Sequence, residues 1–173
     1  MDINKLVEVL KATLQPDQRE QAEQQLNEVH KIIGFTPSLL QVVMSDQVEM
    51  PVRQAGVIYL KNMVTQFWEA REATNPTDPI PFFIHEQDRQ FIRDNIIEAV
   101  MQAPDPVRVQ LTVCISSMVK ADFPGRWTGI AEKVAFYLQS EDYNTWLGAL
   151  LCLYQLIKNF EYKKPEERGA LNQ

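Results

Sequence analysis

The sequence PVRQAGVIYLKNMVTQFW, residues 51–68, decides the fold class of this chain. Its apolar residues recur at steps of three and four, which is the spacing of one face of an α-helix. Pro51 stands at its start, where proline is tolerated because the first amides of a helix have no partner inside the helix. The stretch therefore predicts a long helix with one buried face.

A second stretch resembles the first at an offset of 55 residues. Residues 106–108 repeat the PVR of residues 51–53, and residues 118–119 repeat the MV of residues 63–64. When the proline-rich segment 69–84 is left out, the period falls to about 40 residues, within the range of HEAT and armadillo repeats. Pairs of short antiparallel helices bury their apolar faces only by stacking side by side. We therefore predict an all-α fold, a right-handed α-solenoid of about four HEAT repeats.

Proline positions and apolar spacing divide the rest of the chain into helices. Thr36 is predicted to be an N-cap residue, with Pro37 at the first helical position. Segment 69–84 contains three prolines and is predicted to be a surface loop. The last helix is apolar nearly all round, so we expect neighbours to bury it on several sides. The eight predicted helices cover about residues 3–13, 17–33, 36–45, 51–68, 86–102, 105–122, 127–138 and 142–162.

The composition favours a protein-binding module. The formal net charge is −6, which disfavours nucleic acid because phosphate contacts need clustered lysines and arginines. An acidic surface suits basic protein partners. The longest uncharged run, residues 143–157, is too short to cross a bilayer, so no membrane partner is predicted. Cys114 and Cys152 lie in apolar runs and are predicted to be buried, reduced thiols.

The inventory of reactive residues argues against an enzyme. His30 and His85 are the two histidines, and neither has a cysteine or carboxylate at metal-ligand spacing. The six glycines are scattered and form no phosphate-binding loop, and no Gly-x-Ser-x-Gly elbow occurs. We therefore predict no catalytic residue, no metal and no cofactor.

Residues 51–62, PVRQAGVIYLKN, resemble the N-terminal signature of the importin-β family of nuclear transport receptors. Residues 22–26, AEQQL, are similar to the opening repeat of that family. Later blocks resemble the branch that contains importin seven and importin eight, and the resemblance covers essentially the whole chain. It implies an importin-β N-terminal domain at about residues 22–102, within an N-terminal HEAT-repeat block at residues 1–173. The later blocks are RVQL at 108–111, FP at 123–124, RW at 126–127, FYLQS at 136–140, LCLYQL at 151–156 and YKKPEER at 162–168.

The resemblance implies a function in nuclear import. The N-terminal repeats of the family bind the small GTPase Ran in its GTP form, and that binding releases import cargo in the nucleus. The implied partners are Ran-GTP, the Phe-Gly-repeat proteins of the nuclear pore and, through the full-length receptor, basic protein cargo. The implied localisation is the cytoplasm and the nucleus, with shuttling through nuclear pores. The alternative is a HEAT-repeat interaction scaffold that does not depend on Ran.

A helical wheel of residues 51–68 places Gln54, Lys61 and Thr65 together, away from the stripe that contains Tyr59. Lys61 is a candidate Ran contact because its flexible ammonium suits an acidic side chain. The alternative is an ordinary solvated lysine. Asn62 is also a candidate contact, but the wheel places it near the buried side. A buried amide that bridges neighbouring helices is therefore the favoured interpretation of Asn62.

The internal repeat adds further candidates. At the offset of 55 residues, Ser116 corresponds to Lys61 and Lys120 corresponds to Thr65, so both are predicted to extend the Ran-binding surface. Asn27, with Gln24, is a further candidate from the second predicted helix. A last group is predicted to be structural. Arg53 and Arg108 should form polar ladders between repeats, and Trp68, Trp127 and Trp146 should be core anchors of large buried area.

Overall fold

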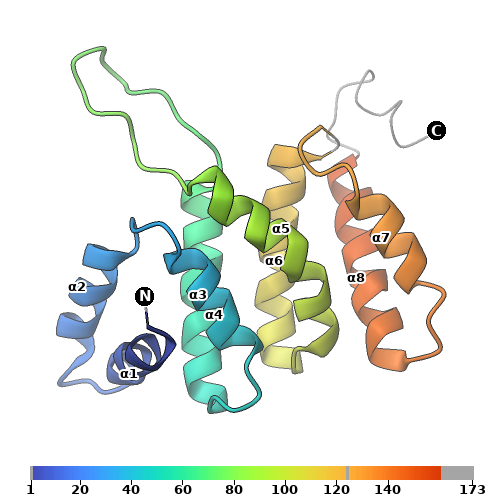
Figure 1. Ribbon diagram of the computed structural model, residues 1–173, viewed down its shortest axis with the longest axis horizontal. Coiled ribbons are helices and arrows are strands. Elements are labelled where there is room, and N and C mark those ends of the chain that lie inside the picture. The colour runs from blue at the N-terminus through green and yellow to red at the C-terminus, as the bar shows by residue number, and fades with distance from the viewer. Residues whose placement is uncertain (1, 124, 161–173) are drawn as a thin grey trace. The chain divides into compact units, whose positions relative to one another are not determined.

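The computed structural model describes residues 2–123 and 125–160. Every regular element in this part of the chain is an α-helix (Figure 1). The predicted all-α class and the eight predicted helices are therefore confirmed, and segment 69–84 contains no helix, as predicted. The helices are α1 (Ile3–Thr13), α2 (Arg19–Val29), α3 (Phe35–Met44), α4 (Met50–Phe67), α5 (Glu86–Gln102), α6 (Asp105–Asp122), α7 (Ile130–Tyr137) and α8 (Tyr143–Phe160).

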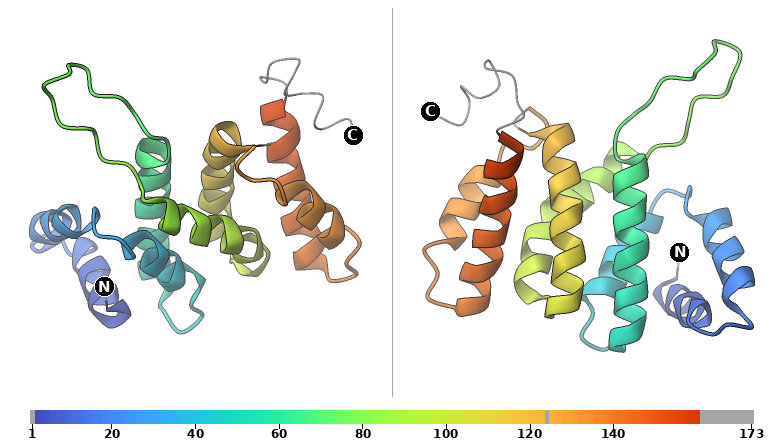
Figure 2. Two further views of the ribbon diagram at one scale, coloured as in Figure 1. Left: turned by 45° about the horizontal axis from the view of Figure 1, so that its top comes forward. Right: turned by 180° about the vertical axis from the view of Figure 1, so that it is seen from behind.

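The chain divides into two compact units, with the boundary between Asp94 and Asn95 inside α5. In the first unit, α1 packs on α2, α3 and α4, and α3 packs on α4 (Figure 1). In the second unit, α8 packs on both α6 and α7, and Figure 2 shows α6 and α8 side by side. The consecutive helices α1 and α2, α3 and α4, and α7 and α8 therefore form packed pairs.

Apolar residues from several helices form the core of the first unit. Its buried side chains include Leu6 and Leu10 of α1, Leu39 of α3 and Leu60 of α4. Burial of such side chains removes apolar surface from water, which is the dominant favourable contribution to folding.

The predicted N-cap at Thr36 is wrong, because α3 begins at Phe35 and its N-cap residue is Gly34. Gly34 has φ 95°, a left-handed conformation that glycine adopts without a steric penalty. Its N–H donates to the Asp88 carboxylate at 2.8 Å, which fixes the turn. The same turn ends α2 at Val29, earlier than the predicted end near residue 33.

Helix α7 is shorter than predicted. It begins at Ile130, with Gly129 as its N-cap residue, and not at Trp127. Trp127 precedes the helix and is buried, and its N–H donates to the carbonyl oxygen of Asp122 at 3.2 Å. Residues 127–129, which the apolar pattern assigns to α7, therefore belong to the connection between α6 and α7. The predicted end of the last helix, near residue 162, lies outside the described residues.

Segment 69–84 is a mostly exposed loop between α4 and α5 (Figure 1). Contacts between its last residues and the end of α4 hold the base of the loop. At the base, the Ile84 N–H donates to the Phe67 carbonyl oxygen at 2.8 Å. The ring of Phe82 packs against that of Phe67, with centroids 5.2 Å apart. Further out, Asn75 and Asp78 close a turn through a main-chain hydrogen bond of 3.0 Å. The loop therefore joins α4 to α5 without loosening their ends.

We expect trypsin to cut this loop after Arg71 in the folded chain, because Arg71 is exposed and lies outside any helix. The fragment that ends at Arg71 should stay bound to the rest of the chain, since the contacts at the loop base join the two sides of the cut. After a brief digestion, a denaturing gel should show the fragments while gel filtration shows one peak at the parent position. Separation of the fragments on gel filtration would contradict the fixed base.

Candidate protein-binding surface

Helix α4 has two unlike faces. One face is buried against α1 and α3. On the other face, Ile58, Asn62 and Thr65 follow helical steps of four and three and are exposed. The buried residues are Val52, Arg53, Gly56, Val57, Leu60, Met63 and Val64.

Four predicted contact residues lie on α4. Asn62 and Thr65 are exposed, and Gln54 and Lys61 are half-buried. The interpretation of Asn62 as a buried amide is wrong, because Asn62 is exposed and the buried face of α4 is centred near Leu60. The Thr65 hydroxyl donates to the main-chain oxygens of Lys61 at 2.9 Å and Asn62 at 3.2 Å, so its one donor is used within the helix. Thr65 can offer a partner its oxygen as an acceptor.

A small groove of about 210 Å³ brings a fifth predicted residue to the same side of the first unit. Asn27 of α2 and Asn62 of α4 both line it. The Tyr59 hydroxyl donates to Asn27 Oδ1 at 3.3 Å, which links the two helices. Burial raises the pKa of Tyr59 to about 12, so its hydroxyl remains protonated at neutral pH. The groove is lined by Asn27, His30, Tyr59, Asn62, Met63, Gln66 and Phe67.

The other two predicted residues lie on α6 in the second unit. Lys120 is exposed in the last turn, and Ser116 is half-buried. Ser116 Oγ accepts a hydrogen bond of 3.3 Å from Asn159 Nδ2, and the same amide donates to the Gln155 carbonyl oxygen at 2.7 Å. Sequence reasoning missed Asn159. It lies where α8 meets α6, but Lys158 directly precedes it, so the sequence gives no separate signal for it.

The repeated arginines are structural, as predicted, but they do not form the expected ladder between repeats. Arg53 Nε donates to the Val43 carbonyl oxygen at 2.9 Å, at the end of the preceding helix. Arg108 donates to the carbonyl oxygens of Val100 at 3.2 Å and Ala103 at 2.8 Å, at the end of α5. The last carbonyls of a helix have no partner inside it. Each arginine therefore caps the helix that precedes its own.

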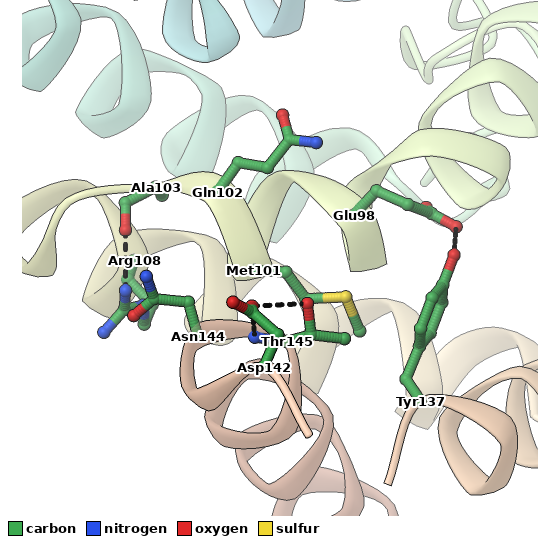
Figure 3. A pocket seen from close by; sticks show the side chains of 9 residues that line it. All are labelled: Glu98, Met101, Gln102, Ala103, Arg108, Tyr137, Asp142, Asn144 and Thr145. Carbon is green, nitrogen blue, oxygen red and sulfur yellow. Dashed lines mark hydrogen bonds between the residues drawn. The ribbon is translucent and has the colours of Figure 1, made fainter. Parts of the chain in front are cut away.

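A larger hollow of about 410 Å³ lies in the second unit (Figure 3). Its polar side chains bond to one another. The Tyr137 hydroxyl donates to Glu98 Oε1 at 3.1 Å. The main-chain N–H and hydroxyl of Thr145 donate to Asp142 Oδ2 at 3.0 and 2.9 Å, and these bonds lower the pKa of Asp142. The predicted contact residues do not line this hollow. Sequence reasoning missed it because its walls come from two junctions that are distant in the sequence, one between α5 and α6 and the other between α7 and α8.

The thiols are buried, as predicted. Cys114 and Cys152 are both buried. Burial, with a smaller contribution from the negative charge of Glu98, raises the pKa of Cys152 to about 12. Its thiol therefore stays protonated and is a poor nucleophile. Within residues 2–123 and 125–160, no three His, Cys, Asp or Glu side chains gather as a metal site requires.

The tryptophans divide. Trp68 and Trp127 are buried core anchors, as predicted. Trp146 is 39 % exposed, so the prediction that it is a buried core anchor is wrong. It lies on a face of α8 that neither α6 nor α7 covers. Among the described helices, none has the length and apolar character needed to cross a bilayer.

Comparison with known proteins identifies relatives along the whole chain. Residues 22–102 match the family model described as importin-beta N-terminal domain. Importin-8 of Homo sapiens is 56 % identical over 171 residues, which cover 99 % of this chain and 16 % of that protein. Importin-8 of Danio rerio is 53 % identical, with coverage of 99 % and 17 %. A probable importin-7 homolog of Dictyostelium discoideum is 30 % identical over 82 % of this chain and 13 % of its own length. The chain spans about a sixth of the length of the two importin-8 relatives.

Solved structures share the fold. The exportin Cse1 in its cargo-free, cytoplasmic state matches 99 % of this chain and 18 % of its own chain, with a TM-score of 0.87 and 21 % identity. A structure of Kap95p, concerned with the switch loops of RanGDP, matches 90 % of this chain and 19 % of its own, with a TM-score of 0.68 and 17 % identity. These likenesses confirm the predicted HEAT-repeat fold.

Proposed function

The chain belongs to the importin-β family of nuclear transport receptors, on the branch that contains importin seven and importin eight, and we propose that it binds Ran in its GTP form. Binding at these repeats would couple the nucleotide state of Ran to the release of cargo during protein import into the nucleus. Cargo and pore contacts belong to the full-length receptor in this proposal. The proposal rests chiefly on the exposed face of α4, which lies within the matched N-terminal domain.

This face has the composition of a protein interface. Ile58 is 44 % exposed and is flanked on the same helix by polar Asn62 and Thr65 and by the half-buried Lys61. An apolar centre with a polar rim is typical of protein–protein contacts. A related observation concerns Kap95p, whose binding induces the switch loops of RanGDP to adopt the GTP-bound conformation. Because Kap95p shares the fold of this chain, its partner supports Ran as the partner proposed here.

We propose Lys61, Gln54, Thr65, Asn62 and Asn27 as the contact residues of the first unit. Lys61 supplies the positive charge, and the carboxamides of Gln54, Asn62 and Asn27 each offer a donor and an acceptor. Ser116 and Lys120 are proposed contacts of the second unit. Since Asn159 already donates to Ser116 Oγ, this serine would contribute through its remaining hydrogen-bonding capacity.

We expect Lys61→Glu to raise the Kd for GTP-loaded Ran about tenfold, because an attraction of about 1.4 kcal/mol is lost when the charge is reversed. Titration calorimetry at 0.1 M salt measures the change. Lys31→Glu is the matched control, because it reverses an exposed lysine of the same unit outside the proposed contact set and should leave the Kd unchanged. Equal binding to GTP-loaded and GDP-loaded Ran, or binding to neither, would favour a scaffold that does not depend on Ran.

The remaining partners follow from the same family assignment. We propose that the full-length receptor carries basic protein cargo and contacts the Phe-Gly repeats of pore proteins while it shuttles between cytoplasm and nucleus. A fluorescent fusion of the full-length receptor should accumulate at the nuclear rim and enter the nucleus of permeabilised cells. Exclusion from the nucleus in the presence of Ran and an energy source would contradict this part of the proposal.

A further inference from the structure

The groove of about 210 Å³ in the first unit runs between α2 and α4. Both helices pack on α1, which lies between them (Figure 2). On α4 the lining residues follow helical steps of three and four from Tyr59 to Phe67, and at the end of α2 they are Asn27 and His30, three residues apart. The groove therefore follows one edge of each helix.

The groove has a mainly aromatic floor and a polar rim. The floor consists of side chains that are buried or half-buried, namely His30, Tyr59, Met63 and Phe67. The rim consists of three exposed carboxamides, those of Asn27, Asn62 and Gln66. At protein interfaces, the side chains that contribute most to binding sit in such pockets, where a surrounding rim excludes water.

Neighbouring rings hold the floor in a fixed shape. The His30 ring stacks on that of Phe67, with centroids 5.6 Å apart. Phe82, from the base of the loop, packs edge-on against His30 at 5.5 Å and against Phe67 at 5.2 Å. The Tyr59 ring packs edge-on against the buried Phe35 at 5.9 Å. A pocket that is shaped before binding loses little conformational freedom when it is filled.

The size and chemistry of the groove select one apolar side chain as its occupant. Pockets for cofactors and other small ligands measure about 300–1,000 Å³, so this groove is too small for them. Among the described residues that line it, none is Asp, Glu, Lys or Arg, so a charged side chain would find no ion-pair partner there. A large apolar or aromatic side chain can pack on the rings of the floor and on the Met63 sulfur.

We propose that the groove holds one large apolar side chain of Ran, and this inference rests on the function proposed above. Asn27 and Asn62 belong both to the rim and to the proposed Ran contact, so the groove is continuous with that surface. The exposed Ile58 lies one helical turn from Asn62. A partner that covers this surface therefore covers the groove, and the buried anchor contributes more to affinity than the polar contacts around it.

Tyr59 is a positioning residue at the rim. Its hydroxyl donates to Asn27 Oδ1 at 3.3 Å, which fixes the orientation of the carboxamide. The Nδ2 group of the same amide can then donate to a main-chain oxygen of Ran beside the anchor. Because burial raises the pKa of Tyr59 to about 12, its hydroxyl stays a donor at neutral pH.

Gln66→Trp tests the groove in the 173-residue chain, because an indole at this exposed rim position fills it. The Kd for GTP-loaded Ran should rise about thirtyfold, the loss expected when an anchor is denied its pocket. Gln25→Trp is the matched control, because Gln25 is exposed on α2 and lies about 160° around that helix from Asn27. It should leave the Kd unchanged. Titration calorimetry measures both Kd values, and circular dichroism shows whether both variants are folded.

The heat-capacity change of binding separates filling of the groove from a general disturbance of the surface. Burial of apolar surface on binding makes this change negative. Because the indole covers the floor before Ran binds, Gln66→Trp should make the heat-capacity change less negative, whereas Gln25→Trp should not. A value for Gln66→Trp equal to that of the parent chain overturns the buried anchor.

A double-mutant cycle tests the positioning role of Tyr59. Tyr59→Phe keeps the ring in the floor but removes the hydroxyl that holds Asn27, so the Kd should rise about fivefold. In the Asn27→Ala background, Tyr59→Phe should have no further effect. An equal rise in both backgrounds shows that the hydroxyl does not act through Asn27 and overturns this role.

Failure of this inference is distinguishable from failure of the proposed function. If the parent chain and Gln66→Trp bind GTP-loaded Ran equally, the groove is not an anchor site and the proposed function stands. If the parent chain binds Ran in neither nucleotide state, both are overturned. A Phe-Gly-repeat peptide provides the last arm and should not bind at the groove. If this peptide bound the parent chain but not Gln66→Trp, the groove would belong to a pore protein, and Ran would be overturned as its occupant.

Discussion

Replacing Gly148 with valine is expected to lower the free energy of unfolding of the second unit by about 3 kcal/mol. A Cβ at Gly148 would lie 2.6 Å from Met101 Cγ and 3.0 Å from Met101 Cα. The Cγ atom can move with its side chain, but the Cα atom belongs to the backbone of α5. The two helices must therefore separate, and the added methyl groups of valine enlarge the clash. Urea unfolding followed by circular dichroism measures the loss.

Gly56→Ala is the matched control for Gly148→Ala. Gly56 is also buried in a helix, but a Cβ there would meet methyl groups of Leu10 and Val43 at 3.4 Å and of Leu39 at 3.8 Å, and no backbone atom is among these nearest contacts. The gain in helix propensity from glycine to alanine is up to about 1 kcal/mol. Gly56→Ala should therefore be at least as stable as the parent, whereas Gly148→Ala should be less stable. Equal changes in the two alanine variants would show that the contact with Met101 yields easily.

Helices could be predicted from the sequence where local pattern alone decides them. The predicted bounds of α5 and α6 match the structure, because acidic first turns and Pro106 mark their starts within the sequence itself. The start of α3 depends instead on the bond between Gly34 and Asp88, which are 54 residues apart. No pattern among neighbouring residues shows such a pair. The sequence therefore identifies Asp88 as a first-turn acid but not as the partner of a distant turn.

The candidate site could be predicted only in part, because exposure depends on how a helix is rotated. The helical wheel centres the buried stripe of α4 near Tyr59 and so places Asn62 towards the interior. The structure centres it near Leu60, since α4 packs against both α1 and α3. One residue corresponds to 100° of rotation, enough to move Asn62 to the exposed face. The contacts that set this rotation come from α3, the preceding helix, and from α1, which ends at Thr13, far earlier in the chain than the start of α4 at Met50.

Buried arginines are the feature that sequence reasoning did not detect. Arg93 is 1 % exposed in its side chain, yet it follows a polar stretch that looks like a solvated helix surface. Its guanidinium donates to Glu86 Oε1 at 2.7 Å and to Gln90 Oε1 at 3.0 Å. It also lies 5.5 Å from the centre of the Trp68 ring. Glu86 pairs in turn with Arg89 at 2.8 Å. This cluster ties α5 to the end of α4.

Arg93→Ala is expected to lower the free energy of unfolding by about 3 to 4 kcal/mol, because it empties a buried site, removes one of the two arginines that pair with Glu86 and takes the cation from the Trp68 ring. Arg93→Lys keeps the charge but not the planar fork that reaches two acceptors at once, so it should recover only part of the loss. Urea unfolding of both variants measures these changes. Lys11→Ala removes an exposed ion pair of 3.7 Å with Glu8 and should change stability by less than about 0.5 kcal/mol. If Arg93→Ala lost no more stability than Lys11→Ala, the buried cluster would make no net contribution, and α4 and α5 would be held together by apolar packing alone.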